Sequence, residues 1–256
     1  MSAIKTVNVR GRIIGGALPL ICAPIVARSG GELARAADEM LALRPDIVEW
    51  RVDYLDEVED ISAVLAYLDA LRAKLGDCPL IFTCRVDSEG GVRPISLERR
   101  LELIKRVIAT GHVDIVDFEL CNGEAAIRGV REAARAGAVR LILSSHEFTS
   151  TPSADEIVAR LVREQELGAD IAKIAVMPAC VEDLLTLLSA TNRMRERHTR
   201  IPLITVSMSG LGLVSRVAAG VFGSAITFGS GSTSSAPGQI PVAELRAALG
   251  IIQKYS

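Results

Sequence analysis

The chain has 256 residues, of which 49% are hydrophobic and 23% are charged, and its formal net charge at pH 7 is −2. It has no basic excess and only 4% aromatic residues, which argues against a nucleic-acid-binding surface. No uninterrupted apolar run reaches about 18 residues, so no membrane span is expected. The length suits one large α/β domain or two small ones.

The cysteines and histidines argue against a disulfide framework and against a metal site. The five cysteines are scattered, odd in number and without CxxC spacing, which indicates reduced thiols in a cytoplasmic protein. The three histidines form no HxxxH or HExxH pair, so no metal site is predicted. The N-terminal residues lack the pattern of a signal peptide.

In chain order, the first expected element is a hairpin within residues 1–18, where "VNVRGRIIGG" precedes the first long apolar run. Eight apolar, β-rich runs follow, and most of them are continuous rather than alternating. Such runs are typical of parallel strands that are covered on both faces. The predicted strands are residues 19–26, 46–53, 79–86, 113–120, 139–146, 170–177, 201–208 and 224–230.

Segments with a helical period separate these strands. In the segment after residue 152, Ser153 and Glu156 form a capping box, and Gly168 is placed to end the helix. A last helix is expected to begin near Pro241. Eight strand–helix alternations predict an α/β fold of the (β/α)8 TIM-barrel type, as a single domain over residues 1–256 whose floor the hairpin closes. The alternative is a doubly wound open sheet, but no GxGxxG motif follows the first strand.

Charged residues occur at the carboxyl ends of strands two to six, where TIM barrels carry their chemistry. Burying charge is costly, so a structural core does not need them there. Solvation at the barrel rim is the alternative for Asp53, Asp87 and Glu147. It is a poor explanation for residues flanked by apolar strand positions. These are Glu49, Arg51, Asp117 and Lys173.

Lys173 lies in the middle of the apolar segment "GADIAKIAVMPA". It is either a salt-bridged core lysine, a phosphate-binding lysine or a nucleophile. A lysine attacks a ketone only when it is unprotonated, and burial or cationic neighbours such as Arg85 and Arg216 would favour that form. His146 ends the preceding strand, so it is close enough in a barrel to transfer protons over the same substrate.

The Gly/Ser-rich stretch "FGSGSTSSAPGQ" follows the last strand. It is a phosphate-binding loop, a flexible connection or an active-site lid. Composition alone does not decide among the three.

Seven motifs, in order along nearly the whole chain, resemble type I 3-dehydroquinate dehydratase, the Schiff-base dehydroquinase of the shikimate pathway. They are "EWRVD", "TCRVDSEGG", "VDFEL", "SSHEF", "AKIAVMP", "SRVAAGVFGSAITFG" and "SAPGQI". The resemblance implies a (β/α)8 lyase that converts 3-dehydroquinate to 3-dehydroshikimate by syn elimination. It also implies a cytoplasmic homodimer that needs no metal or cofactor, since the lysine is the electron sink.

The resemblance also implies residue roles. Lys173 would form the Schiff base, His146 would transfer protons, and Glu89 would support the histidine. Arg216 would pair with the substrate carboxylate, as guanidinium forks do well. The other residues implied to contact substrate are Glu49, Arg51, Arg85 and Asp117, with Ser235 and Gln239 in a lid over residues 231–239.

One segment departs from the family pattern. Where the family often has "SMGxxG", this chain has "SMSGLG", so Ser209 replaces a glycine. The loop that leads to Arg216 is therefore expected to differ locally.

Overall fold

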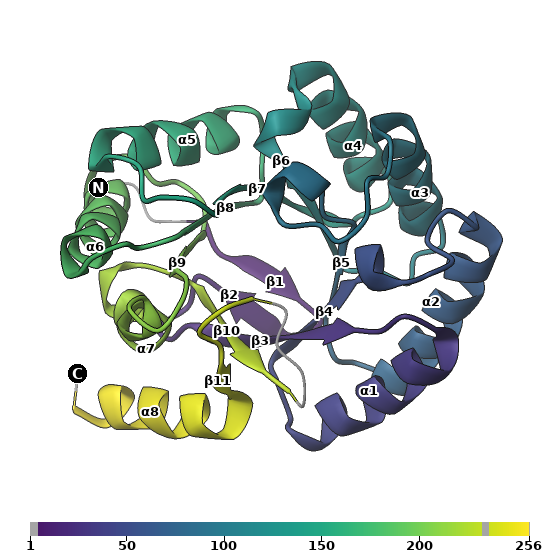
Figure 1. The fold of residues 1–256 in the computed structure, drawn as a ribbon, viewed down its shortest axis with the longest axis horizontal. Helices are drawn as coiled ribbons and strands as arrows, with labels where there is room; N and C mark the ends of the chain where they lie inside the picture. Colours follow the sequence, from purple (N-terminus) through teal and green to yellow (C-terminus); the bar gives the residue numbers. More distant parts are fainter. Residues whose placement is uncertain (1–4, 232–235, 256) are drawn as a thin grey trace.

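A computed structural model describes residues 5–231 and 236–255 of the chain. Eight parallel strands stand side by side in chain order, and helices surround them (Figure 1). The barrel strands are β3 (Leu20–Val26), β4 (Ile47–Arg51), β5 (Leu80–Thr83), β6 (Ile115–Glu119), β7 (Arg140–Glu147), β8 (Ile171–Val176), β9 (Leu203–Ser207) and β10 (Ile226–Ser230). The helices are α1 (Gly30–Ala42), α2 (Ile61–Leu75), α3 (Leu97–Ala109), α4 (Glu124–Ala136), α5 (Ala154–Glu166), α6 (Val181–Arg197), α7 (Leu213–Phe222) and α8 (Val242–Tyr255).

The sheet closes on itself. Strand β10 pairs in parallel with β3, and a two-residue strand, β11 (Ile240–Pro241), extends β10. At the other seam, the Ala225 N–H donates to the Leu203 carbonyl at 2.7 Å, beside a parallel bridge between Leu203 and Ser224. This closure confirms the predicted barrel and excludes the doubly wound alternative.

The N-terminal hairpin lies under the barrel, as predicted. Strands β1 (Val7–Val9) and β2 (Arg12–Ile14) pair antiparallel through a turn in which Arg10 and Gly11 both have positive φ. Val7, Val9 and Ile14 are buried and pack with the lowest inward-facing residues of the barrel strands. The hairpin therefore covers the apolar floor of the barrel.

Local sequence signals account for the helix ends. The Ser153 hydroxyl accepts from the Glu156 N–H, as the capping box predicts, and Gly168 follows α5 with φ of 91°. Helix α8 begins at Val242, next to the expected Pro241. Helix α2 lies between β4 and β5 and helix α7 between β9 and β10, in keeping with the predicted strand–helix alternation. Within the described residues, no helix is both long and apolar enough to cross a membrane.

Candidate active site

The site is built on a pattern that recurs in three alternate strands. Each of β4, β6 and β8 is preceded by Asp and begins with Ile, in "DIVE", "DIVD" and "DIAK". The fourth residue of each motif is Glu49, Asp117 or Lys173. In a (β/α)8 barrel, alternate strands contribute side chains to the same interior layer. The three polar residues therefore meet inside the barrel, one layer above buried isoleucines.

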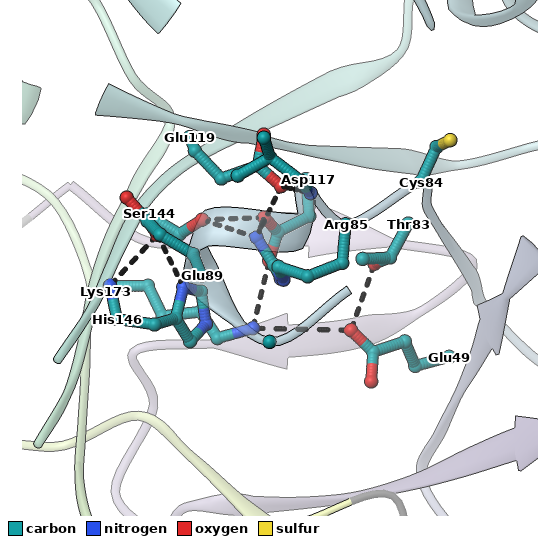
Figure 2. A network of polar contacts seen from close by, with 12 residues as sticks. Glu49, Thr83, Cys84, Arg85, Glu89, Asp117, Glu119, Ser144, His146 and Lys173 are labelled. Carbon is teal, nitrogen blue, oxygen red and sulfur yellow. Dashed lines mark hydrogen bonds and ion pairs between the residues drawn. The ribbon is translucent and has the colours of Figure 1, made fainter. Parts of the chain in front are cut away.

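Lys173 lies between two carboxylates (Figure 2). Its Nζ is 2.8 Å from Asp117 Oδ2 and 3.9 Å from Glu49 Oε1, and only 5% of the residue is exposed. The Phe228 ring centroid is 4.9 Å from the same nitrogen. The charged groups in contact with the amine are thus carboxylates, not the arginines that the sequence suggested. The ion pair with Asp117 fits the interpretation of Lys173 as a salt-bridged lysine.

Asp117 is the ionised partner in this layer. Burial alone would raise the pKa of its carboxyl group, but Arg85 and Lys173 outweigh that effect and hold it well below the usual range. Arg85 Nη1 lies 2.9 Å from Asp117 Oδ1, while Lys173 takes the other oxygen. The two oxygens of one carboxylate therefore hold one cation each.

His146 and Glu89 form the pair that was predicted. Glu89 Oε2 accepts from the His146 backbone N–H at 2.9 Å and lies 2.9 Å from its Nδ1. Burial raises the pKa of Glu89 to about 7, and burial together with Arg85 and Lys173 lowers the pKa of His146 well below its usual value. The lowered pKa of His146 keeps the imidazole uncharged at neutral pH. When Glu89 is ionised, the Nδ1 proton is directed at it and Nε2 is left as the base.

Two of the three arginines in the site have carboxylate partners. Arg51 forms a two-point ion pair with Asp53, and both of its contacts are 2.8 Å. Asp53 is fully buried, which rules out the alternative that it is solvated at the rim. Its oxygens also face the backbone N–H groups of Arg85 and Val92. Asp53 therefore ties the end of β4 to the loop that carries Glu89.

Arg216 is the exception. It is 3% exposed, and within residues 5–231 and 236–255 it donates to two backbone carbonyls: Phe228 at 3.3 Å and Pro237 at 2.9 Å. It has no carboxylate partner among the described residues, and burial lowers its pKa to about 10. The buried guanidinium is therefore suited to bind an anionic group of a ligand.

One cavity brings most of these side chains together. Its lining includes Glu49, Arg51, Arg85, Glu89, His146, Lys173, Arg216 and Gln239. Asp117 lies behind Lys173 rather than in this lining. Ser235 lies outside the described residues. A larger cleft of about 840 Å³, at the carboxyl ends of α5 and α6, contains none of these side chains.

Pro237, in the described part of the predicted lid, contacts the segment "SMSGLG" that departs from the family pattern. The Pro237 carbonyl accepts from the Ser209 N–H at 3.2 Å as well as from Arg216. Ser209 has φ of 58°, in the left-handed region that favours glycine. A Cβ on Gly238 would lie 2.2 Å from the Ser209 carbonyl oxygen, so only glycine fits there. Ser209 and Arg216 therefore share one carbonyl acceptor, that of Pro237.

Sequence reasoning did not assign four buried polar residues around the site. Ser144 donates to Asp117 at 2.6 Å, and Glu119 and Arg100 form a buried ion pair. Glu164 accepts from the Lys173 backbone N–H at 2.9 Å, and burial raises its pKa well above the usual value. Glu119 follows the inward alternation from Asp117, which was the one available signal. Arg100 and Glu164 lie on helices, where no local pattern distinguishes them.

Comparison with known proteins places the chain among dehydroquinases. A model of the family described as type I 3-dehydroquinase matches residues 21–256. The 3-dehydroquinate dehydratase of Bacillus velezensis is 44% identical over 252 residues, which cover 98% of this chain and 100% of that protein. The Bacillus licheniformis enzyme is 45% identical over 250 residues, 98% of each chain.

Solved structures agree with the sequence matches. Type I 3-dehydroquinate dehydratase from Clostridium difficile, with covalently modified comenic acid, superposes with a TM-score of 0.97 at 43% identity. That match covers 99% of this chain and 100% of the other. The 3-dehydroquinate dehydratase from Geobacillus kaustophilus gives a TM-score of 0.95 at 43% identity, with 98% of each chain covered.

Proposed function

The chain belongs to the type I 3-dehydroquinase family, and from that premise we propose that it dehydrates 3-dehydroquinate to 3-dehydroshikimate through a Schiff base on Lys173. The observation that carries the assignment of residues is one cavity in which Lys173, His146 and Arg216 converge. They supply an amine, a base and a buried cation that has no carboxylate partner among the described residues. These groups match the ketone, the acidic C–H and the carboxylate of the substrate.

The carboxylates of Asp117 and Glu49 suit the first step, which is formation of the Schiff base. Lys173 gives up one ammonium proton, and its neutral amine attacks the C3 ketone. The carbonyl oxygen then leaves as water, taking up that proton and a second one from the nitrogen, and an iminium ion remains. The positive charge therefore returns to the place where the ammonium was, between Asp117 and Glu49. Groups that are already fixed around a developing charge stabilise it without reorganisation.

His146 acts in the elimination. The iminium acidifies the C2 proton, and His146 removes it, so that the electron pair moves into the C2–C3 bond and neutralises the nitrogen. The resulting enamine expels the C1 hydroxyl, which leaves as water with a proton from His146 or from a water it orients. One histidine serving as base and then acid fits a syn elimination. Hydrolysis of the product imine frees Lys173.

The remaining predicted residues bind the substrate. We assign the carboxylate to Arg216 and the hydroxyls to Arg51, Arg85 and Glu49, with Gln239 at the lid. Ser235 is proposed for the same lid on the basis of the family resemblance. The whole chain is proposed to be one domain, with residues 231–239 closing over the site.

We further propose a cytoplasmic homodimer. All five cysteines are unpaired, which suits a reducing compartment. Large apolar side chains remain exposed on α7 and α8, including Val221 at 55% and Ile251 at 64%, as expected where a second copy packs. Light scattering after size exclusion, compared with the mass of 27.3 kDa for one chain, tests the dimer.

Borohydride trapping tests the chemistry. Borohydride with 3-dehydroquinate should reduce the imine to a stable adduct, which peptide mass spectrometry should place on Lys173. Lys173→Ala should abolish both adduct and turnover, whereas Lys105→Ala, at an exposed position on α3, should retain both. Sugar phosphates should give no adduct. Absence of any adduct with 3-dehydroquinate would reject the Schiff-base mechanism.

The histidine is tested in the same assay. His146→Ala should still form the trapped imine but should lose on the order of 10²–10⁴-fold in turnover, because its base is missing. His112→Ala, at the opposite end of the barrel, is the matched control. Near-normal turnover by His146→Ala would disprove the assigned role.

A further inference from the structure

Glu119 is a buried charge that the proposed reaction does not use. It is the last residue of β6 and is 0% exposed. It lies two residues beyond Asp117, and side chains two apart on a strand point to the same side. Glu119 therefore occupies the next inward position above the lysine layer (Figure 2).

Protein donors occupy both oxygens of Glu119. Oε1 accepts from Arg85 Nη1 at 2.8 Å and from the Val86 N–H at 3.1 Å. Oε2 accepts from Asn122 Nδ2 at 2.8 Å and from Arg100 Nη2. A carboxylate offers about four lone-pair sites. Since all are taken, Glu119 has no site left for a substrate and acts through its neighbours.

Arg85 is the neighbour that faces the cavity. Its side-chain hydrogen bonds to the described residues all leave from Nη1, which contacts Asp117, Glu119 and Ser144 within 3.0 Å. The rest of its guanidinium has no acceptor among those residues, and Arg85 lines the cavity. Anchoring one end of a rigid fork on two carboxylates fixes the direction of its other N–H groups.

Arg100 holds Glu119 from outside the barrel. It reaches inward from α3 with 1% exposure, and it also donates to the Cys84 carbonyl and to Asn122 at 3.0 Å. Its charge offsets that of Glu119. Glu119 in turn shares Arg85 with Asp117, whose second oxygen remains free for Lys173.

We propose that Glu119, backed by Arg100, is a positioning residue for substrate binding. It aims Arg85 at the substrate hydroxyls and keeps Arg85 from taking both oxygens of Asp117. This inference rests on the proposed function and adds to it a residue that does not touch substrate. It predicts that losing the Glu119 carboxylate weakens binding more than it slows the chemistry.

The test is Glu119→Gln, which preserves shape but presents an NH₂ group toward Arg100. We expect KM for 3-dehydroquinate to rise roughly 10-fold or more, because small misplacements of a binding group are costly. We expect kcat to change less than KM, and trapping at Lys173 to persist at saturating substrate. A purely structural defect would lower the active fraction, and hence kcat, without moving KM.

A double-mutant cycle tests whether Glu119 acts through Arg85 or independently of it. If Glu119 acts through Arg85, adding Glu119→Gln to Arg85→Gln should raise KM no further. Additive effects, or an unchanged KM in Glu119→Gln, would overturn the inference. Asp38→Asn is the control, because it breaks an ion pair with Lys74 between α1 and α2, away from the cavity, and should leave KM unchanged.

A second variant and the activity of the wild-type protein serve as further controls. If Glu119→Gln does not fold, Glu119→Asp carries the same test, because it keeps the charge but shortens the reach, and KM should again rise. Lack of turnover by the wild-type protein would reject the proposed function itself. Wild-type turnover combined with an unchanged KM in the variant would reject only the positioning role.

Discussion

Glu89 and His146 show how burial sets the chemistry of single residues. Desolvation raises the pKa of the Glu89 carboxyl group to about 7, and it lowers the pKa of the imidazole. Only an ionised Glu89 attracts the proton on Nδ1 and stabilises the imidazolium that forms when His146 removes the C2 proton. Activity should therefore follow the ionisation of Glu89.

We predict that kcat/KM of the wild-type protein rises with pH through about 7, as Glu89 loses its proton. Glu89→Gln cannot ionise, so this limb should disappear and the rate above pH 8 should fall on the order of 10-fold or more. A pH–rate profile for both proteins measures this. The same limb in the variant would assign the titration to another group.

The same pKa predicts a stability effect of opposite sense. An acid whose pKa is raised on folding binds more protons in the folded state, so its contribution to stability is lost as pH rises from its unfolded value near 4.3 to about 7. Glu89→Gln should remove this loss. Its urea midpoint, relative to wild type, should therefore increase between pH 4.5 and 8.

At the scale of elements, the three aspartates before β4, β6 and β8 fasten neighbouring strands. Asp46 accepts from the Ile21 N–H, Asp114 from the Leu80 N–H and Asp170 from the Leu141 N–H, at 2.9 to 3.0 Å. Each bond fixes the start of one strand against its neighbour. The recurring "DI" pair therefore sets the level of the interior layer, and the polar residue two positions after the isoleucine arrives at the height of the active site.

The loop after β9 carries local strain at Ser209, whose φ is 58°. A left-handed conformation costs a non-glycine residue about 1–2 kcal/mol, and a glycine at the same position avoids this cost. Glycine also makes the unfolded chain more flexible, which offsets part of the stabilisation. Ser209→Gly should therefore stabilise the protein by roughly 0.5–1 kcal/mol in urea unfolding. Ser150→Gly, at a loop residue without positive φ, should not stabilise it. Equal effects would show that Ser209 is unstrained.

At the scale of the whole molecule, the hairpin and the barrel share one apolar floor. Ile14 is fully buried under the barrel, whereas the adjacent Ile13 is 51% exposed. Ile14→Ala should lower the free energy of unfolding by about 2–4 kcal/mol, because it removes buried methylenes and leaves a cavity.

The neighbouring isoleucine is the control. Ile13→Ala should change stability by less than about 1 kcal/mol, because little of its surface is removed from water. Chemical denaturation of both variants measures the difference. Similar losses at the two positions would mean that the hairpin is not anchored by Ile14.

Much of this protein was determined by the sequence alone. The eight strands, the hairpin and the cap of α5 follow from local patterns, since apolar periodicity and capping depend on residues close together in the chain. The motifs around Lys173 and His146 also indicated the family, which the comparisons confirmed. The assigned roles of single residues stay predictions that the variants above test.

Only the tertiary structure decided which charges are partners. Asp53 is buried against Arg51 rather than solvated, and Lys173 lies against Asp117 rather than beside arginines. Glu119 is held by Arg100, which comes from a helix 19 residues away in the chain. The Lys173–Asp117 and Arg100–Glu119 pairs depend on the stagger between strands and on which helix packs behind them. These are properties of the closed barrel that no local stretch of sequence contains.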